Sequence, residues 1–194
     1  MSWQGSIEVI CGPMFSGKTE ELIRRVRRAQ IARLKVQIFK PSIDDRYHKT
    51  QVVSHSSQAV DAQVVDNSED IFRYLQDTTR VVAIDEIQFF DKNIIAVVNR
   101  LANQGRRVIA AGLDLDYKTI PFGPMPELLA IADEVFKIKA ICTVCGNPAT
   151  RSQRTVIGNK ATVLVGEKEA YEARCRAHYE LDEANNLSST DLSI

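Results

Sequence analysis

The chain has 194 residues, 25 lysines and arginines against 25 aspartates and glutamates, and 44% apolar side chains. A chain without net charge is poorly suited to bind mainly nucleic-acid phosphates, and its ordinary, well-mixed apolar content excludes global disorder. The N-terminal residues lack the charged and apolar regions of a signal peptide, and no apolar run is long enough to span a bilayer. We therefore expect a globular, cytoplasmic protein that has neither nucleic acid nor a membrane as its partner.

Apolar runs and helical periods alternate along the first 141 residues. Residues 6–11 form an apolar run that ends at Gly12 and Pro13, and from Thr19 apolar side chains recur at helical spacing. Further strands are predicted at residues 36–39, 81–84, 108–111 and 135–141, helices at 71–75 and 94–101, and a long surface loop at 44–57. Continuous apolar strands separated by helices are typical of an α/β fold with a parallel sheet covered on both faces. The carboxyl ends of such strands share one edge, where ligands bind.

Residues 12–19 match the pattern G-x-x-x-x-G-K-[ST] of a phosphate-binding loop. The glycines let backbone N–H groups approach a phosphate, and the following helix adds unpaired N–H groups and the positive end of its dipole. Lys18 would reach the β- and γ-phosphates, and the Thr19 hydroxyl would bind Mg²⁺. The alternative, a glycine-rich turn with a surface lysine, is disfavoured because the motif lies between a strand and a helix. The predicted nucleotide-binding residues are Gly12, Pro13, Met14, Phe15, Ser16, Gly17, Lys18 and Thr19.

Two acidic residues follow the apolar strand predicted at 81–84. This position puts Asp85 and Glu86 at the same sheet edge as the phosphate loop. Asp85 is placed to hold Mg²⁺, and Glu86 to accept the proton of an attacking hydroxyl beside the γ-phosphate. The alternatives are a helix-capping role for Asp85 and a solvated loop carboxylate for Glu86.

The class of nucleotide protein is narrowed by what the motifs lack. The only Asn-Lys pair, at Asn159 and Lys160, is not followed by the Asp that guanine recognition needs. A small-molecule kinase and an ATPase that works on nucleic acid remain, together with a regulatory module that binds nucleotide without turnover. The second class needs a basic track, and the only candidate is the arginine-rich run 24–28, which a solvated helix face explains better.

The last third of the chain contains two metal-binding knuckles, Cys142-x-x-Cys145 and Cys175-x-x-His178. Three thiolates and one imidazole favour tetrahedral Zn²⁺ with every position filled by protein, so the ion would be structural. The alternative is a set of unrelated buried cysteines and a surface histidine. Cys11 lies in a strand and is interpreted as a core residue. We therefore expect a nucleotide-binding domain at 1–141, a zinc-binding lasso domain at 142–181 and a frayed or disordered tail at 182–194.

The 29 residues between the knuckles, 146–174, are too many for zinc alone to order. Ordering their backbone costs on the order of 30–50 kcal/mol. A structural zinc supplies about 10–16 kcal/mol, so strand pairing or a ligand must contribute the rest. We hypothesise that this segment is a substrate lid that becomes fully ordered only with ligand.

Several motifs in this order resemble the cytosolic-type (type II) thymidine kinases, in a bacterial version. The resemblance runs from about residue 7 to 179. It rests on the phosphate loop, Asp85-Glu86-Ile87-Gln88-Phe89-Phe90, Gly112-Leu113-Asp114, Pro121-Phe122-Gly123 and the two knuckles. It implies a RecA-like P-loop domain with a zinc-held lasso, ATP and thymidine as substrates, and a homotetramer inhibited by dTTP. Some members have a fourth cysteine at the position of His178, or phenylalanine at that of Tyr117; zinc accepts either ligand.

The resemblance also implies roles for individual residues. Glu86 matches the general base and Asp85 the Mg²⁺-linked acid. Further positions that match the ATP- and Mg²⁺-binding part of the family pattern are Asp44, Asp45, Arg46 and Gln88. Positions that match the nucleoside pocket are Met14, Phe89, Leu113, Tyr117, Phe122 and Ser152, with Tyr171 near the sugar and the lasso strand Thr162, Val163, Leu164, Val165 and Gly166 at the thymine edge. On sequence alone, Phe89, Tyr117 and Phe122 could equally be core aromatics.

Overall fold

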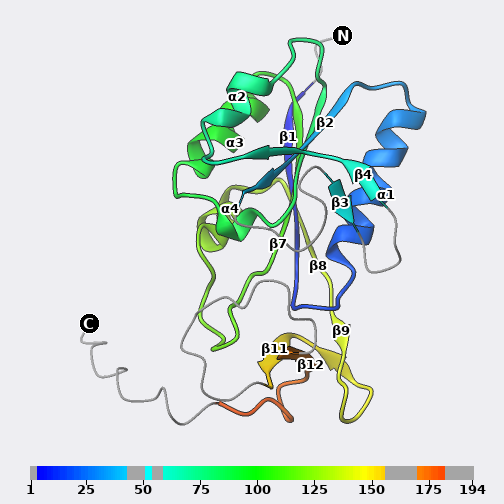
Figure 1. Ribbon diagram of the computed structural model, residues 1–194, viewed down its shortest axis with the longest axis vertical. Coiled ribbons are helices and arrows are strands. Elements are labelled where there is room, and N and C mark those ends of the chain that lie inside the picture. The colour runs from blue at the N-terminus through cyan, green and yellow to red at the C-terminus, as the bar shows by residue number, and fades with distance from the viewer. Residues whose placement is uncertain (1–3, 43–50, 54–58, 156–169, 182–194) are drawn as a thin grey trace.

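The predicted apolar runs form the strands of one parallel sheet (Figure 1). The computed structural model describes residues 4–42, 51–53, 59–155 and 170–181. Six strands lie side by side in the order β5-β2-β6-β7-β1-β8. Their bounds are β1 Ser6–Cys11, β2 Val36–Pro41, β5 Gln63–Val65, β6 Val81–Ile84, β7 Arg107–Gly112 and β8 Glu134–Lys137. All neighbouring pairs are parallel, so every carboxyl end reaches the same edge.

Helices cover both faces of this sheet (Figure 1). Helix α1, Lys18–Ile31, packs on one face, and α2 (Asp70–Tyr74), α3 (Ile94–Asn103) and α4 (Met125–Ile131) pack on the other. Side chains of β1 alternate between the two cores: Val9 and Cys11 face α3 and α4, and Ile10 faces α1. This arrangement confirms the predicted P-loop (RecA-like) α/β class, and full burial of Cys11 confirms its place in the core.

Strand β1 lies between β7 and β8, and the phosphate loop follows directly at its carboxyl end. It pairs with β7 on one side and β8 on the other, and α1 leaves directly from the loop at its end. Strand β7 separates β1 from β6, so the phosphate loop and the acids after β6 lie two strands apart at one edge. In open α/β sheets, ligands bind at the carboxyl ends of the strands, where the strand order reverses.

The described structure departs from the sequence prediction in several elements. Residues 51–53 lie in the predicted loop 44–57 but form strand β3, Gln51–Val53, paired with β4, Ala59–Asp61. Strand β5 and helix α4 were not predicted, because β5 has only three residues and α4 begins in a proline-rich segment. The strand predicted at 135–141 is two strands, β8 and β9 (Ala140–Ile141), in different sheets. Among the described helices, none combines the length and apolar character that crossing a bilayer requires.

A smaller unit of β-strands lies beyond the carboxyl edge of the main sheet (Figure 1). Strand β9 pairs with β10, Pro148–Ala149, and β11, Arg151–Arg154, pairs with β12, Tyr171–Arg174, both antiparallel. Its small core contains Ala140, Ala149 and Ala173 together with Cys142 and Cys175. Strand pairing therefore orders the parts of the segment 146–174 that adjoin the knuckles. The tail predicted at 182–194 lies outside the described residues.

Candidate functional site

The phosphate loop folds around one of its own carbonyl groups. Ser16 Oγ and Lys18 Nζ each donate a hydrogen bond to the carbonyl oxygen of Pro13 at 2.8 Å. Gly12 has φ 148°, and a Cβ there would lie 2.2 Å from the carbonyl oxygen of Ile138. Only glycine fits this position, because the backbone of the neighbouring segment occupies the space of a side chain. The loop thus has the compact shape that a phosphate cradle needs.

Asp85 connects the end of β6 with the first turn of α1. It is buried, and the Thr19 hydroxyl donates to its Oδ2 at 3.4 Å. Its other oxygen, Oδ1, accepts a hydrogen bond from the N–H of Glu86 at 3.0 Å. A carboxylate and a hydroxyl in contact are the oxygen ligands that Mg²⁺ prefers. The structure thus brings the two predicted Mg²⁺ ligands into contact with each other.

Glu86 has a backbone conformation that is unusual for its residue type. Its φ is 51°, in the left-handed region that costs a residue with a side chain about 1–3 kcal/mol. Its Oε2 accepts a hydrogen bond from Gln88 Nε2 at 2.6 Å. Strained residues cluster at functional sites, where the surrounding structure holds them in place. A carboxylate held in this way differs from the solvated loop carboxylate that was the alternative.

The residues of the predicted nucleoside pocket lie in two small groups. Tyr117 and Tyr171 are buried and pack with Ala170, with Met14 of the phosphate loop against them. The second group is an edge-to-face pair of Phe89 and Phe122, with ring centroids 5.5 Å apart. None of these five residues belongs to the hydrophobic clusters on the two faces of the main sheet. Tyr117 and Tyr171 instead form a small buried cluster of their own, between the phosphate loop and the small β unit.

The small β unit contacts the phosphate loop directly. Ser152 of β11 is buried, and its Oγ accepts a hydrogen bond from the backbone N–H of Met14 at 3.0 Å. Tyr179 donates its hydroxyl to the carbonyl oxygen of Tyr117 at 2.6 Å, and the Arg154 guanidinium lies 4.9 Å from the centroid of the Tyr117 ring. The unit therefore closes over the same edge that carries the phosphate loop and the acids.

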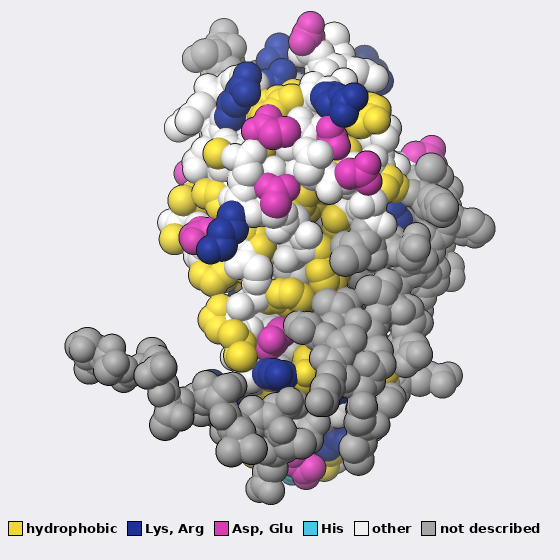
Figure 2. Space-filling model, turned by 60° about the vertical axis from the view of Figure 1, so that its left-hand side comes forward, with side chains coloured by type: hydrophobic (Ala, Val, Ile, Leu, Met, Phe, Trp, Pro, Cys, Tyr) yellow, Lys and Arg dark blue, Asp and Glu magenta, His cyan; other side chains and the backbone are white. Residues whose placement is uncertain are grey.

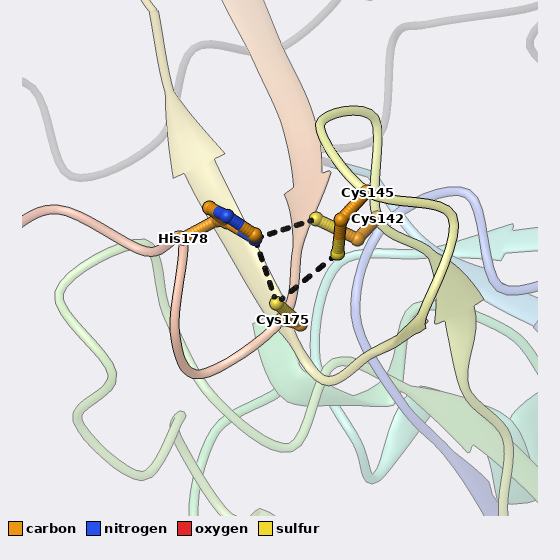
Figure 3. A group of neighbouring side chains, drawn as sticks. All are labelled: Cys142, Cys145, Cys175 and His178. Carbon is orange, nitrogen blue, oxygen red and sulfur yellow. Dashed lines mark hydrogen bonds between the residues drawn. The ribbon is translucent and has the colours of Figure 1, made fainter.

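The four predicted zinc ligands form one cluster (Figure 3). Their ligand atoms all lie within 4.8 Å of one another. Cys145 Sγ lies 3.8 Å from Cys175 Sγ, and His178 Nδ1 lies 3.9 Å from Cys142 Sγ. Tetrahedral zinc with bonds of about 2.3 Å requires ligand separations of about 3.8 Å. The 3.2 Å between Cys175 Sγ and His178 Nδ1 is shorter, so the cluster has the ligand chemistry of a zinc site and approximately its size.

The thiols of the chain differ in pKa, and the cluster is not uniform. A hydrogen bond from the backbone N–H of residue 147 lowers the pKa of Cys145, but burial and the neighbouring thiols of Cys142 and Cys175 outweigh it, so this pKa is raised. Burial by itself raises the pKa of Cys142, but hydrogen bonds from backbone N–H groups of residues 175, 145 and 144 outweigh it and lower the pKa to about 6. The thiolate is the form that binds metal. In contrast, burial raises the pKa of the Cys11 thiol to about 11. Cys11 is thus an inert core residue, as the sequence indicated.

One interaction at this edge was not predicted. Asp114 is buried, and Lys137, the last residue of β8, places its Nζ 2.6 Å from Asp114 Oδ2. The Oδ1 atom of Asp114 is buried without a hydrogen-bond partner. Gly112-Leu113-Asp114 was visible as a motif, but nothing local in the sequence pairs Asp114 with a lysine on another strand. The predicted site residues Asp44, Asp45 and Arg46, and Thr162 to Gly166, lie outside the described residues.

Comparison with known proteins matches most of the chain to one family. A family model described as thymidine kinase matches residues 5–179. Among solved structures, the ATPase DotB of Legionella pneumophila is similar over 66% of this chain, at 16% identity and a TM-score of 0.39. Domain III of the Thermotoga maritima replication initiation protein DnaA is similar over 70%, at 13% identity and a TM-score of 0.42. This chain covers 34% and 55% of those two chains, and at such TM-scores neither likeness bears on function.

Proposed function

Because the chain belongs to the thymidine kinase family, we propose that it transfers the γ-phosphoryl group of ATP to the 5′-hydroxyl of thymidine. The products are dTMP and ADP, and the reaction serves nucleoside salvage for DNA synthesis. The observation that supports this proposal most strongly is the hydrogen bond between Ser152 and Met14. It brings the metal-binding unit against the phosphate loop, so that ATP phosphates and a nucleoside would meet in one enclosed place.

The residues after β1 and β6 supply the chemistry of the transfer. Lys18 neutralises charge on the β- and γ-phosphates. Its Nζ already lies at the phosphate loop, where it donates a hydrogen bond to the carbonyl oxygen of Pro13. Glu86 accepts the proton of the 5′-hydroxyl as its oxygen attacks the γ-phosphorus, and the bond to the bridging oxygen of ADP breaks. Thr19 and Asp85 would hold Mg²⁺, which supplies charge neutralisation at the phosphates when bound. Asp44, Asp45, Arg46 and Gln88 complete the proposed nucleotide contacts.

The proposed nucleoside pocket uses shape and hydrogen bonds rather than charge. Met14, Tyr117 and Tyr171 pack together at the junction of the two units, and Phe89 and Phe122 form the second aromatic pair. We place thymine among these side chains with Leu113 and Ser152, and its polar edge on the main chain of Thr162 to Gly166. A pocket of this kind rejects a wrong base through the cost of unpaired polar groups.

The zinc ion has a structural role in this proposal. Cys142, Cys145, Cys175 and His178 would fill all its coordination positions and fix the base of the lasso. We propose that residues 146–174 act as a lid over the nucleoside. Amide exchange of this segment should slow when thymidine and ATP are added. Equal protection with and without substrates would contradict the lid.

The assembly and regulation that we propose follow the family. The edge strand β8 leaves Val135 and Phe136 exposed, and Ile141 and Val144 beyond it are exposed too. These side chains are suited to contacts in a homotetramer, which light scattering would detect. We further propose dTTP as a feedback inhibitor and the cytoplasm as the place of action.

The charge distribution gives no support to the alternative of an ATPase that works on nucleic acid. In the arginine-rich run of α1, Arg24 pairs with Glu21, and Arg25 is buried among Glu8, Glu21 and Glu134. The prediction of a solvated helix face is therefore wrong for Arg25, because its guanidinium forms ion pairs with Glu8 of β1 and Glu134 of β8 and is buried. On the face seen in Figure 2, basic and acidic side chains of the described residues are interspersed. A continuous basic track is what such binding requires.

Two experiments test the proposal. Purified protein incubated with Mg-ATP and each natural nucleoside should produce a monophosphate from thymidine. The variant Glu86→Gln should bind nucleotide but lose kcat by about 10²-fold or more, because it cannot accept a proton. The exposed Glu127→Gln is the matched control and should retain activity. ATP hydrolysis stimulated by single-stranded DNA without nucleoside phosphorylation would overturn the proposal, as would nucleotide binding without turnover.

A further inference from the structure

Gln88 is a polar side chain enclosed at the centre of the candidate site. It lies in the short 3₁₀ turn η1, Ile87–Phe89, that follows the acids, and only 2% of its surface is exposed. Its carboxamide makes two hydrogen bonds. Nε2 donates to Glu86 Oε2 at 2.6 Å, and Oε1 accepts from the backbone N–H of Leu113 at 3.1 Å. The side chain thus bridges the proposed general base and the segment after β7.

The orientation of this carboxamide is fixed by its partners. The backbone N–H of Leu113 can only donate, so the oxygen of Gln88 must face it. The NH₂ group must then face Glu86, whose ionised carboxylate can only accept. If the carboxamide were turned by 180°, buried donors and acceptors would be left unpaired, which costs about 1–3 kcal/mol. The network therefore has one favoured arrangement, with a donor directed at the carboxylate.

Gln88 packs against two glycines on separate segments, at positions where any side chain would collide with it. A Cβ at Gly112 would lie 2.6 Å from Gln88 Oε1, and a Cβ at Gly123 would lie 2.3 Å from the main-chain oxygen of Gln88. Gly123 also has φ 52°, a conformation that other residues seldom adopt. The turn with Gln88 is therefore held closely between the ends of β7 and the start of α4.

From these contacts we infer that Gln88 is a positioning residue that holds the Glu86 carboxylate and ties it to Leu113 of the proposed nucleoside pocket. This inference rests on the proposed role of Glu86 as general base. It differs from the nucleotide contact that the family resemblance implies for Gln88. The left-handed backbone of Glu86 persists only where surrounding contacts hold the residue in place. Gln88, two residues along the chain, supplies one of these contacts.

Two substitutions test the donor and the acceptor of the carboxamide separately. Gln88→Met keeps the length of the side chain but neither donates nor accepts. Gln88→Glu keeps an acceptor for the Leu113 N–H and replaces the donor by a second carboxylate, which must share a proton with Glu86. The exposed Gln104→Met is the control for the loss of a carboxamide. Melting temperatures identify any variant that fails to fold.

The expected results are distinct for each variant. Gln88→Glu should lower kcat by about 10²-fold with little change in KM for thymidine, because only the contact with Glu86 is lost. Gln88→Met should lower kcat by about tenfold and also raise KM for thymidine. In a double-mutant cycle, Gln88→Met should cause little further loss of kcat in the Glu86→Gln background, since it acts through Glu86.

Failure of the inference differs from failure of the proposed function. Normal kcat in Gln88→Glu, or equal losses from Gln88→Met in the wild-type and Glu86→Gln backgrounds, would overturn the positioning role while Glu86 remained the base. Near-normal kcat in Glu86→Gln would remove the general base and, with it, this inference. A KM for ATP raised by Gln88→Met at unchanged kcat would instead assign Gln88 to nucleotide binding.

Discussion

The hydroxyl oxygen of Ser152 accepts a hydrogen bond from the backbone N–H of Met14 at 3.0 Å, although 138 residues separate them. Met14 belongs to the phosphate loop, and Ser152 to a strand of the metal-binding unit. Ser152 is buried and Met14 is partly buried, and an unpaired N–H in such a place is costly. The contact therefore couples the shape of the phosphate loop to the integrity of the metal-binding unit.

Removal of this acceptor should weaken nucleotide binding. Ser152→Ala leaves the Met14 N–H without its partner, at a cost of about 1–3 kcal/mol. We expect a lower melting temperature and a KM for ATP that is several times higher, measured by steady-state kinetics. Ser152→Thr keeps a hydroxyl and is the matched control. An unchanged KM for ATP in Ser152→Ala would show that the loop does not depend on this contact.

The purified protein should contain one zinc ion per chain, measured by atomic absorption. Cys175→Ser should lose the ion, because three remaining ligands leave a coordination position open. The unit should then lose amide-exchange protection in residues 140–155 and 170–179, since structural zinc contributes about 10–16 kcal/mol to folding. Cys11→Ala is the control and should retain full zinc content, because Cys11 lies in the main core. Zinc retained in Cys175→Ser would contradict the predicted ligand set.

The ion pairs around Arg25 should make stability depend on acid pH. Burial raises the pKa of Glu8, but hydrogen bonds and charges from Arg107 and Arg25 outweigh it, so the pKa lies below the ordinary value of 4.5. Hydrogen bonding to Arg24 is the main cause that lowers the pKa of Glu21 to about 2. Since these folded-state values are depressed, the pairs stabilise the protein above pH about 4.5, and this contribution is lost as the pH falls towards about 2.

Glu8→Gln tests this dependence. It removes one of the three carboxylates that pair with Arg25, together with the partner of Arg107, and should cost about 1–3 kcal/mol at pH 7. The melting temperature of the variant should also fall less steeply between pH 5 and pH 3 than that of the wild type, because one titrating acceptor is gone. Glu127→Gln, at an exposed position, should reproduce the wild-type slope. Parallel curves for Glu8→Gln and the wild type would contradict the assignment.

Gly112→Ala should impair catalysis more than folding. The added Cβ would lie 2.6 Å from Gln88 Oε1 and 3.0 Å from a side-chain carbon of Ile87, so the carboxamide must move. We expect kcat to fall by about tenfold or more, because the hydrogen bond to Glu86 is displaced with it. The comparison is Gly146→Ala, where a Cβ meets nothing within 4 Å although φ is 72°, and where only stability should change. Equal kcat in Gly112→Ala and the wild type would show that Gln88 can shift without consequence.

The sequence by itself determined the features that are encoded locally. The eight residues of the phosphate loop are contiguous, the acids directly follow an apolar strand, and each knuckle places two ligands three residues apart. Buried parallel strands are continuous apolar runs, so the fold class could also be predicted. Helix α4 and strand β3 could not be predicted, because α4 begins among prolines and β3 is a three-residue strand in a polar segment.

Only the tertiary structure decided which distant groups meet. Nothing near Ser152 in the sequence shows that its hydroxyl faces Met14, and nothing near Gln88 shows that Leu113 orients its carboxamide. Arg25 belongs to an arginine-rich run that looks solvated, yet carboxylates from β1 and β8 enclose it. The physical reason is that a hydrogen bond or ion pair depends on where two chain segments end up in space, whereas helical and strand periods depend only on neighbours along the chain.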